Sequence, residues 1–280
     1  MRSGRDLPGL DALLADPALA AVLAGRRDGL LLLDYDGTLA PFTPRRDEAR
    51  PYPGVVEVLA RLPEAGSGRF AVVTGRPAAT AAAFLAPARP AAIWGCHGAE
   101  RLVPGQPSLL GPATPPATQA ALERAMAMAL PVAGREALES KPAGLALHWR
   151  ALPAAARQAM ETRIGPAWAE LARETGLALH PFDGGLELRL PGFHKGLAVK
   201  ALARDHPHAV LAYVGDDLTD EDAFQALGPN DVGVLAGRPD RPSAANYALN
   251  LPEGLLGFLS AWADAATARQ QQPGSTHVQR

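Results

Sequence analysis

Residues 30–39 of this chain read LLLLDYDGTL, a short apolar run that ends abruptly in two carboxylates, a glycine and a hydroxyl. The run has the length of a buried strand, and a turn signal bounds it. Because side chains alternate along a strand, Asp34 and Asp36 are expected to point the same way at its carboxyl end. Open α/β sheets place their chemistry at that end. The alternative interpretation is a strand followed by an ordinary Asp-Gly turn.

Two carboxylates this close together indicate a cation. Their mutual repulsion destabilises the site unless a positive charge lies between them. A hard cation that prefers oxygen ligands, such as Mg²⁺, meets that requirement. We therefore expect Mg²⁺ as the cofactor.

The composition limits the class of protein. At 280 residues, 48% of them apolar, the chain can form one large domain or two smaller ones with a substantial core. A formal net charge of −2 leaves no basic excess for a general nucleic-acid partner. The single cysteine, Cys96, excludes an internal disulfide, and no apolar stretch has the length of a membrane span. We expect a cytoplasmic, monomeric protein with neither a nucleic-acid nor a membrane partner.

Strands and helices alternate at both ends of the chain. After one or two short helices, strands are expected at 30–33, 69–73 and 91–94, with helices over 54–62 and 77–85. The same alternation returns with helices over 195–205 and 254–265 and strands at 209–214 and 232–235. This pattern predicts an α/β fold with a doubly wound parallel sheet.

The middle of the chain follows a different pattern. A linker rich in proline, glycine, serine and threonine at 104–116 leads to helices over 118–130 and 154–174 and to strand pairs at 138–141 with 144–150 and 177–181 with 186–190. We therefore expect a discontinuous core domain (1–103 and 192–267), an inserted α+β domain (104–191) and a disordered tail (268–280).

Four polar features fall at expected strand ends or loop exits. They are the pair Asp34 and Asp36, the run 74–76 (Thr-Gly-Arg), Lys195, and the acidic cluster Asp216, Asp217 and Asp220. Only three of the 27 basic residues are lysines, which indicates that Lys195 meets a need for a compact point charge. Carboxylates for a cation, a hydroxyl, a lysine and a helix N-terminus together predict a phosphoryl-transfer site.

These four features, in this order, resemble the motifs of the haloacid-dehalogenase superfamily. Residues 95–100 (GCHGAE), Lys141 with 148–150 (HWR), and 187–189 (ELR) further resemble the trehalose-6-phosphate phosphatase family, over roughly residues 29–262. The resemblance implies a Rossmann-like core with the insert as a cap domain. It also implies Mg²⁺-dependent hydrolysis of trehalose 6-phosphate through an aspartyl-phosphate, the last step of trehalose biosynthesis.

The resemblance assigns a role to each residue at the reacting centre. Asp34 attacks phosphorus, while Asp36 protonates the leaving sugar oxygen and then activates water. Thr74 and Lys195 hold the phosphoryl oxygens. The metal ligands implied are Asp34, the backbone carbonyl of Asp36, Asp216 and, in support, Asp217 and Asp220.

Substrate-binding residues are implied on both sides of the core–cap seam. Arg76 and His97 lie on the core side and contact phosphate or sugar. Lys141, His148 and Glu187 reach the sugar hydroxyls from the cap.

Ordinary structural roles compete with several of these assignments. Asp217, Asp220 and Thr74 are also suited to cap helices, and Lys195 could be a surface lysine. His97 and His148 could be packed histidines, and Lys141 and Glu187 could form a plain salt bridge. Two other functions stay open: a phosphatase for another sugar or glycosyl phosphate, and a non-catalytic sugar-phosphate sensor.

Overall fold

A parallel sheet forms the centre of the larger part of the molecule. The computed structural model describes residues 2–43, 46–63, 67–106, 114–149, 152–182 and 184–271. Within these residues the sheet has the strand order β13-β11-β10-β2-β3-β4-β5, and every neighbouring pair is parallel except β4 with β5. The strands are β2 (Asp28–Leu33), β3 (Phe70–Val73), β4 (Ala92–Gly95), β5 (Glu100–Leu102), β10 (Ala209–Gly215), β11 (Val232–Ala236) and β13 (Tyr247–Leu249).

Both faces of this sheet are covered by helices because its strands are apolar on both sides. On β2, Leu31 and Leu33 face one core cluster while Leu30 and Leu32 face the other. The first cluster is shared with α1 (Leu10–Leu14), α2 (Pro17–Leu23), α3 (Val55–Leu59), α4 (Ala78–Phe84) and α9 (Glu253–Gln270). The second is shared with α7 (Lys195–Asp205) and α8 (Glu221–Ala226). The predicted doubly wound α/β fold is therefore confirmed.

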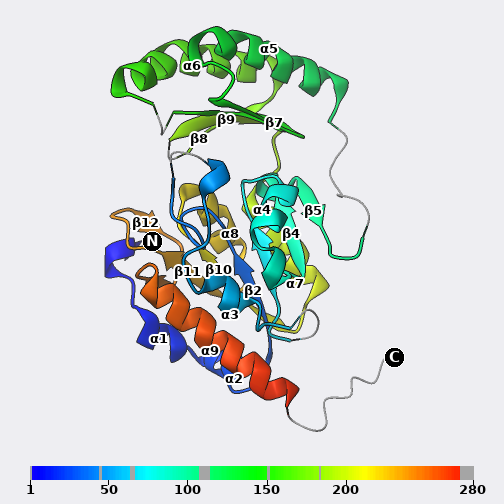
Figure 1. The fold of residues 1–280 in the computed structure, drawn as a ribbon, viewed down its shortest axis with the longest axis vertical. Helices are drawn as coiled ribbons and strands as arrows, with labels where there is room; N and C mark the ends of the chain where they lie inside the picture. The colour runs from blue at the N-terminus through cyan, green and yellow to red at the C-terminus, as the bar shows by residue number, and fades with distance from the viewer. Residues whose placement is uncertain are drawn as a thin grey trace.

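A second sheet lies at one end of the molecule. In the described chain it has the antiparallel order β6-β7-β9-β8, formed by β6 (Leu138–Lys141), β7 (Gly144–His148), β8 (Ala178–Phe182) and β9 (Gly185–Arg189). Helices α5 (Pro116–Ala133) and α6 (Ala154–Thr175) cover its outer face, and its other face is turned toward the parallel sheet (Figure 1). We call α5, α6 and these four strands the upper unit.

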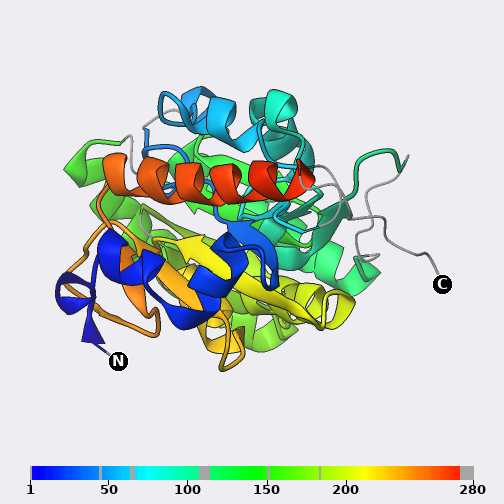
Figure 2. The same cartoon turned by 90° about the horizontal axis from the view of Figure 1, so that it is seen from below.

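Smaller elements complete the chain. Strands β1 (Arg2–Ser3) and β12 (Pro242–Ser243) pair with each other, and short 3-10 helices occupy Gly4–Asp6, Arg46–Glu48, Ala86–Ala88, Cys96–Gly98 and Leu218–Asp220. Helix α9 lies between α3 on one side and the N-terminal helices on the other (Figure 2). None of the helices in the described ranges combines the length and apolar character needed to cross a bilayer.

The structure differs from the sequence-based expectation in a few places. Helix α9 runs to Gln270, so the expected tail begins too early, and residues 272–280 lie outside the described ranges. Much of the expected linker, at 107–113, also lies outside them. Strands β5 and β13 were not predicted, because three residues are too few to show a strand's alternation.

Candidate active site

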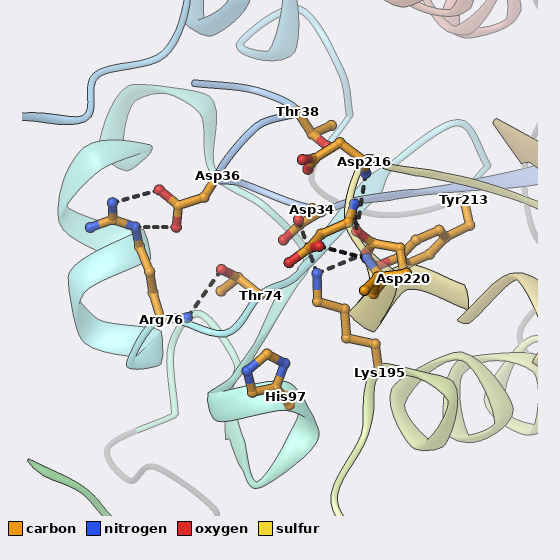
Figure 3. A network of polar contacts seen from close by, with 12 residues as sticks. Asp34, Asp36, Thr38, Thr74, Arg76, His97, Lys195, Tyr213, Asp216 and Asp220 are labelled. Atoms are coloured by element: carbon orange, nitrogen blue, oxygen red, sulfur yellow. Dashed lines mark hydrogen bonds and ion pairs between the residues drawn. The ribbon is translucent and has the colours of Figure 1, made fainter. Parts of the chain in front are cut away.

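The predicted core residues meet at the carboxyl ends of the parallel strands. Asp34 follows β2, Thr74 follows β3, His97 follows β4 and Asp216 follows β10. Neighbouring strands end level with one another, since Val214 pairs with Leu33. Figure 3 shows the resulting group of side chains.

Lys195 lies at the centre of the group. It is the first residue of α7 and is 2% exposed. Its Nζ lies 2.9 Å from Oδ2 of Asp34 and 2.8 Å from Oδ1 of Asp220. Burial opposes the charge of Lys195, but the two carboxylates outweigh burial and raise its pKa above the usual range. Lys195 is therefore a buried cation and not a surface lysine.

Asp220 anchors the loop that carries Asp216. Its Oδ1 accepts from Lys195 and, at 2.5 Å, from the hydroxyl of Tyr213. Its Oδ2 accepts from the backbone N–H groups of Asp216 and Asp217, at 3.0 and 2.9 Å. The approach depends on Gly215, because a Cβ there would lie 2.3 Å from the Asp220 carboxyl carbon.

Three carboxylates form a candidate metal centre. Asp34, Asp216 and Asp220 each offer one oxygen, and these oxygens lie within 4.8 Å of one another. Burial raises the pKa of Asp34 to about 8, with Lys195 opposing the rise and Asp220 adding to it. Burial, Asp34 and Asp220 also raise the pKa of Asp216 well above its usual value. Asp34 and Asp220 are buried and Asp216 is half-buried, and one lysine cannot neutralise three such carboxylates, so the donor set fits a hard divalent cation.

Gly37 and Thr38 hold the Asp216 carboxylate in this group. The hydroxyl of Thr38 donates to Oδ1 of Asp216 at 3.1 Å. Gly37 has a φ of +77°, and a Cβ there would lie 2.1 Å from Oδ2 of Asp216. The glycine and hydroxyl that follow the two aspartates are therefore both required by the position of Asp216.

Asp36 and Asp34 pair with different cations. Both oxygens of Asp36 accept from Arg76, at 2.7 Å from Nε and 2.6 Å from the second terminal nitrogen, so Asp36 lies to one side of the three-carboxylate group (Figure 3). The expected common direction of the two aspartates is not seen, because β2 ends at Leu33 and the chain turns after it. Thr74 lies between the two groups, fully buried, and its hydroxyl accepts from the backbone N–H of Arg76.

Asp217 takes the capping role that its sequence position also allowed. Its side chain accepts from the N–H of Leu218 at the start of the 3-10 helix Leu218–Asp220. Asp220, and not Asp217, completes the three-carboxylate group. A direct metal contact of Asp217 stays a prediction.

A second polar network crosses from the core to the upper unit. The buried carboxylate of Glu187, on β9, lies 2.8 Å from Nζ of Lys141 on β6 and 3.1 Å from Nε2 of His97 on the core. Burial lowers the pKa of His97 to about 4. Burial alone would raise the pKa of Glu187, but Lys141 and His97 outweigh it and hold that pKa well below its usual value. Of the residues predicted to contact the substrate, Lys141 and His97 thus both bind Glu187 in this structure.

His97 sits in an unusual backbone. Cys96, His97 and Gly98 have φ values of 48°, 57° and 97°, so three successive residues are left-handed. Non-glycine residues persist there only where their surroundings hold them. The N–H groups of Cys96 and His97 donate to the carbonyls of Arg76 and Thr74. The His97 ring also lies against Gly75, where a Cβ would be 2.7 Å from it.

The remaining residue of the predicted sugar set, His148, lies in a separate pair. Its Nε2 is 3.1 Å from Oε2 of Glu139, and its ring contacts Phe182. Sequence reasoning missed Glu139, although its spacing of two from Lys141 on the same strand was a usable signal. It also missed Tyr213, whose role depends on contacts that no spacing reveals. Arg150 lies outside the described residues.

Comparisons with known proteins identify the family of this chain. Residues 32–253 match the model of the trehalose-phosphatase family. The trehalose-phosphate phosphatase of Mycobacterium marinum is 30% identical over 259 residues, which cover 84% of this chain and 63% of that protein. The chain spans less than two thirds of the length of the curated relatives it matches first.

Solved structures show the same fold. The C-terminal domain of the Candida albicans trehalose-6-phosphate phosphatase superposes with a TM-score of 0.77 at 20% identity, covering 94% of this chain and 99% of that one. A haloacid dehalogenase-like hydrolase from Bacteroides thetaiotaomicron gives 0.63 at 19% identity, covering 83% and 98%.

Proposed function

This chain belongs to the trehalose-phosphatase family, and on that premise we propose that it hydrolyses trehalose 6-phosphate to trehalose and phosphate, the last step of trehalose biosynthesis. The observation that carries the proposal is the group of Asp34, Lys195, Asp216 and Asp220 at the ends of β2 and β10. Carboxylates and a fixed cation lie side by side there, which supports phosphoryl transfer to a carboxylate nucleophile.

The reaction is proposed to run in two steps through Asp34. Its carboxylate oxygen bonds to phosphorus as the bond from phosphorus to the sugar oxygen breaks, and Asp36 donates a proton to that oxygen. Water then attacks the phosphorus of the aspartyl-phosphate and gives a proton to Asp36, which releases phosphate and restores Asp34. One group serves as acid and then as base because the proton moves in opposite directions in the two steps.

Lys195 and Thr74 are proposed to hold the phosphoryl oxygens. Lys195 is kept charged by Asp34 and Asp220, so its charge is present throughout the reaction. Thr74 follows β3, which pairs with β2 where Leu33 and Val72 are partners, one residue before Asp34. Groups fixed in advance in this way stabilise the charge that redistributes in the transition state.

Mg²⁺ is the cofactor that we propose for the three-carboxylate group. Asp34 and Asp216 would hold it, with Asp220 beside them and the backbone carbonyl of Asp36 as a further ligand. The ion would supply positive charge that offsets the repulsion between the phosphate and Asp34.

The upper unit is proposed to act as a cap that selects the sugar. Lys141 and His97 now both bind Glu187, and a pocket lined by Lys141 and Glu187 has a volume of about 10 Å³, which is room for about one water molecule. A disaccharide therefore needs the seam to open, and its hydroxyls would replace the contacts that His97 and Lys141 make to Glu187. Buried polar groups matched to hydroxyls reject sugars that lack them.

A phosphate-release assay tests the proposal. We expect Mg²⁺-dependent release from trehalose 6-phosphate and much slower release from glucose 6-phosphate. Asp34→Asn should abolish turnover with the fold retained, whereas Asp28→Asn, an exposed aspartate at the other end of β2, should not. Equal or absent activity on the two sugars would contradict the substrate, and an active Asp34→Asn variant would contradict the nucleophile.

A further inference from the structure

Arg76 makes a two-point contact with Asp36 that needs no substrate. Its Nε donates to Oδ2 at 2.7 Å and a terminal nitrogen donates to Oδ1 at 2.6 Å. The Arg76 side chain is 9% exposed and that of Asp36 is 30% exposed. Paired bonds of this kind fix the plane of a carboxylate as well as its position.

Aromatic rings hold the guanidinium of Arg76 in place. It lies 5.2 Å from the ring centre of Tyr35 and 5.3 Å from that of Phe84, and these two rings stack on each other. The hydroxyl of Tyr35 is in turn bound to the carbonyl of Ala49. A planar guanidinium can stack on these aromatic rings, whereas an ammonium group cannot. The orientation of Arg76 is therefore set by the protein.

The backbone of Arg76 also contacts the chain segments that follow β3 and β4. Its N–H donates to the hydroxyl of Thr74 at 3.2 Å, and its carbonyl accepts from the N–H of Cys96 at 2.8 Å. The carboxylate of Glu139, on β6 of the upper unit, also acts on the charge of Arg76. Arg76 thus binds Asp36 on the core and is within electrostatic range of a carboxylate of the upper unit.

We propose that Arg76 is a positioning residue for Asp36 and acts chiefly through it, not as a ligand of the phosphoryl group. This inference rests on the proposed function. The proton that reaches the sugar oxygen leaves from Asp36, so the orientation of that carboxylate sets how readily the sugar departs.

Leaving groups separate positioning from phosphate binding. A sugar alkoxide needs a proton to depart, whereas p-nitrophenolate departs without one. If Arg76 positions Asp36, its loss slows the first step for a sugar phosphate but leaves that step intact for p-nitrophenyl phosphate. If Arg76 binds the phosphoryl group, both substrates lose the first step.

The test uses Arg76→Lys, which keeps the charge but not the fork. On trehalose 6-phosphate we expect kcat to fall by about 100-fold with KM changed by less than about threefold. With p-nitrophenyl phosphate we expect a first-turnover burst of p-nitrophenolate to persist before slow turnover. Arg50→Lys is the matched control, because Arg50 lies 4.4 Å over the ring of Phe84 and should change kcat little.

A double-mutant comparison completes the test. In an Asp36→Asn background, Arg76→Lys should cause no further loss if it acts through Asp36. A lost burst, a large rise in KM with kcat kept, or additive losses would overturn the proposal. An inactive wild-type protein on trehalose 6-phosphate would instead contradict the proposed substrate, and the burst assay would still decide the role of Arg76.

Discussion

His97, on the core, makes a direct polar contact with Glu187, on the upper unit. It is 8% exposed, sits at a φ of 57°, and is held neutral by burial. The neutral ring can donate a hydrogen bond from Nε2 to the Glu187 carboxylate, while the ammonium group of Lys141 balances the negative charge of that carboxylate.

His97 should contribute a fall in the free energy of unfolding between pH 7 and pH 5, whereas Asp34, with its raised pKa, contributes a rise that the His97→Asn comparison cancels. The pKa of His97 is about 4 when folded against an ordinary 6.5, so the unfolded chain binds more protons at this residue in this window. The contribution of His97 to the free energy of unfolding is therefore fully present above pH 6.5. It is lost as the pH falls, by about 2 kcal/mol at pH 5. Urea unfolding at both pH values measures the loss. His97→Asn tolerates the left-handed backbone and should lose about 2 kcal/mol less, and equal losses would contradict the role of His97.

At the scale of elements, helix α6 contains an interior proline, which is unfavourable in a helix. Pro166 lies within it, exposed, and lacks the N–H that would bond to the carbonyl of Thr162. The helix persists because its inner side is tied down: Trp168 is fully buried and its Nε1 donates to the carbonyl of Ala125 on α5. Tertiary packing here outweighs a poor local preference.

Pro166→Ala should therefore stabilise the upper unit. An interior proline costs about 3 kcal/mol, while its removal frees the unfolded chain by up to about 1 kcal/mol, which leaves a net gain of about 2 kcal/mol. Chemical unfolding monitored by tryptophan fluorescence measures it. Ala169→Gly, exposed on the same helix, should destabilise by about 1 kcal/mol. A destabilising Pro166→Ala would show that the proline fits the helix better than we argue.

How much the sequence predicts depends on element length and on whether a residue acts alone. Helix α7 and strand β6 have the predicted bounds, because each carries a clear period and a clear end. Lys195 was identified because it is one of only three lysines and stands at the start of the expected helix over 195–205. The sequence could not predict whether the side chain of Asp217 or that of Asp220 points into the site. That choice depends on the hydrogen bonds that Tyr213 and Lys195 donate to Asp220. The Asp36–Arg76 pair likewise joins loops that are distant in sequence.

On the scale of the whole molecule, the seam between core and upper unit contains the chain's single cysteine. Cys96 is 5% exposed and forms an apolar cluster with Ala99 and with Ala143 of the upper unit, against Leu190 and Phe193. Burial raises the pKa of its thiol above the usual value. A thiol reagent can therefore attack Cys96 only when the seam opens.

Labelling of Cys96 should report that opening. In the wild type the thiol is expected to react slowly. Glu187→Gln removes the carboxylate that joins His97 and Lys141, and should speed labelling by about tenfold or more, since about 1.4 kcal/mol lost from the seam is a factor of ten. Glu174→Gln breaks an exposed pair with Arg124 within the upper unit and should leave the rate unchanged. Equal rates in all three proteins would contradict a seam held by Glu187.

The arrangement of strands also sets an order of assembly during synthesis. The four-stranded sheet takes all its strands from residues 138–189, whereas β2 at the centre of the parallel sheet must wait for β10, where Ala209 pairs with Asp28. Contacts between distant segments close late, and a chain emerges from its N-terminus. On the ribosome, the unit proposed to choose the sugar can thus be complete while Asp34 still lacks Lys195, so recognition is built before reactivity.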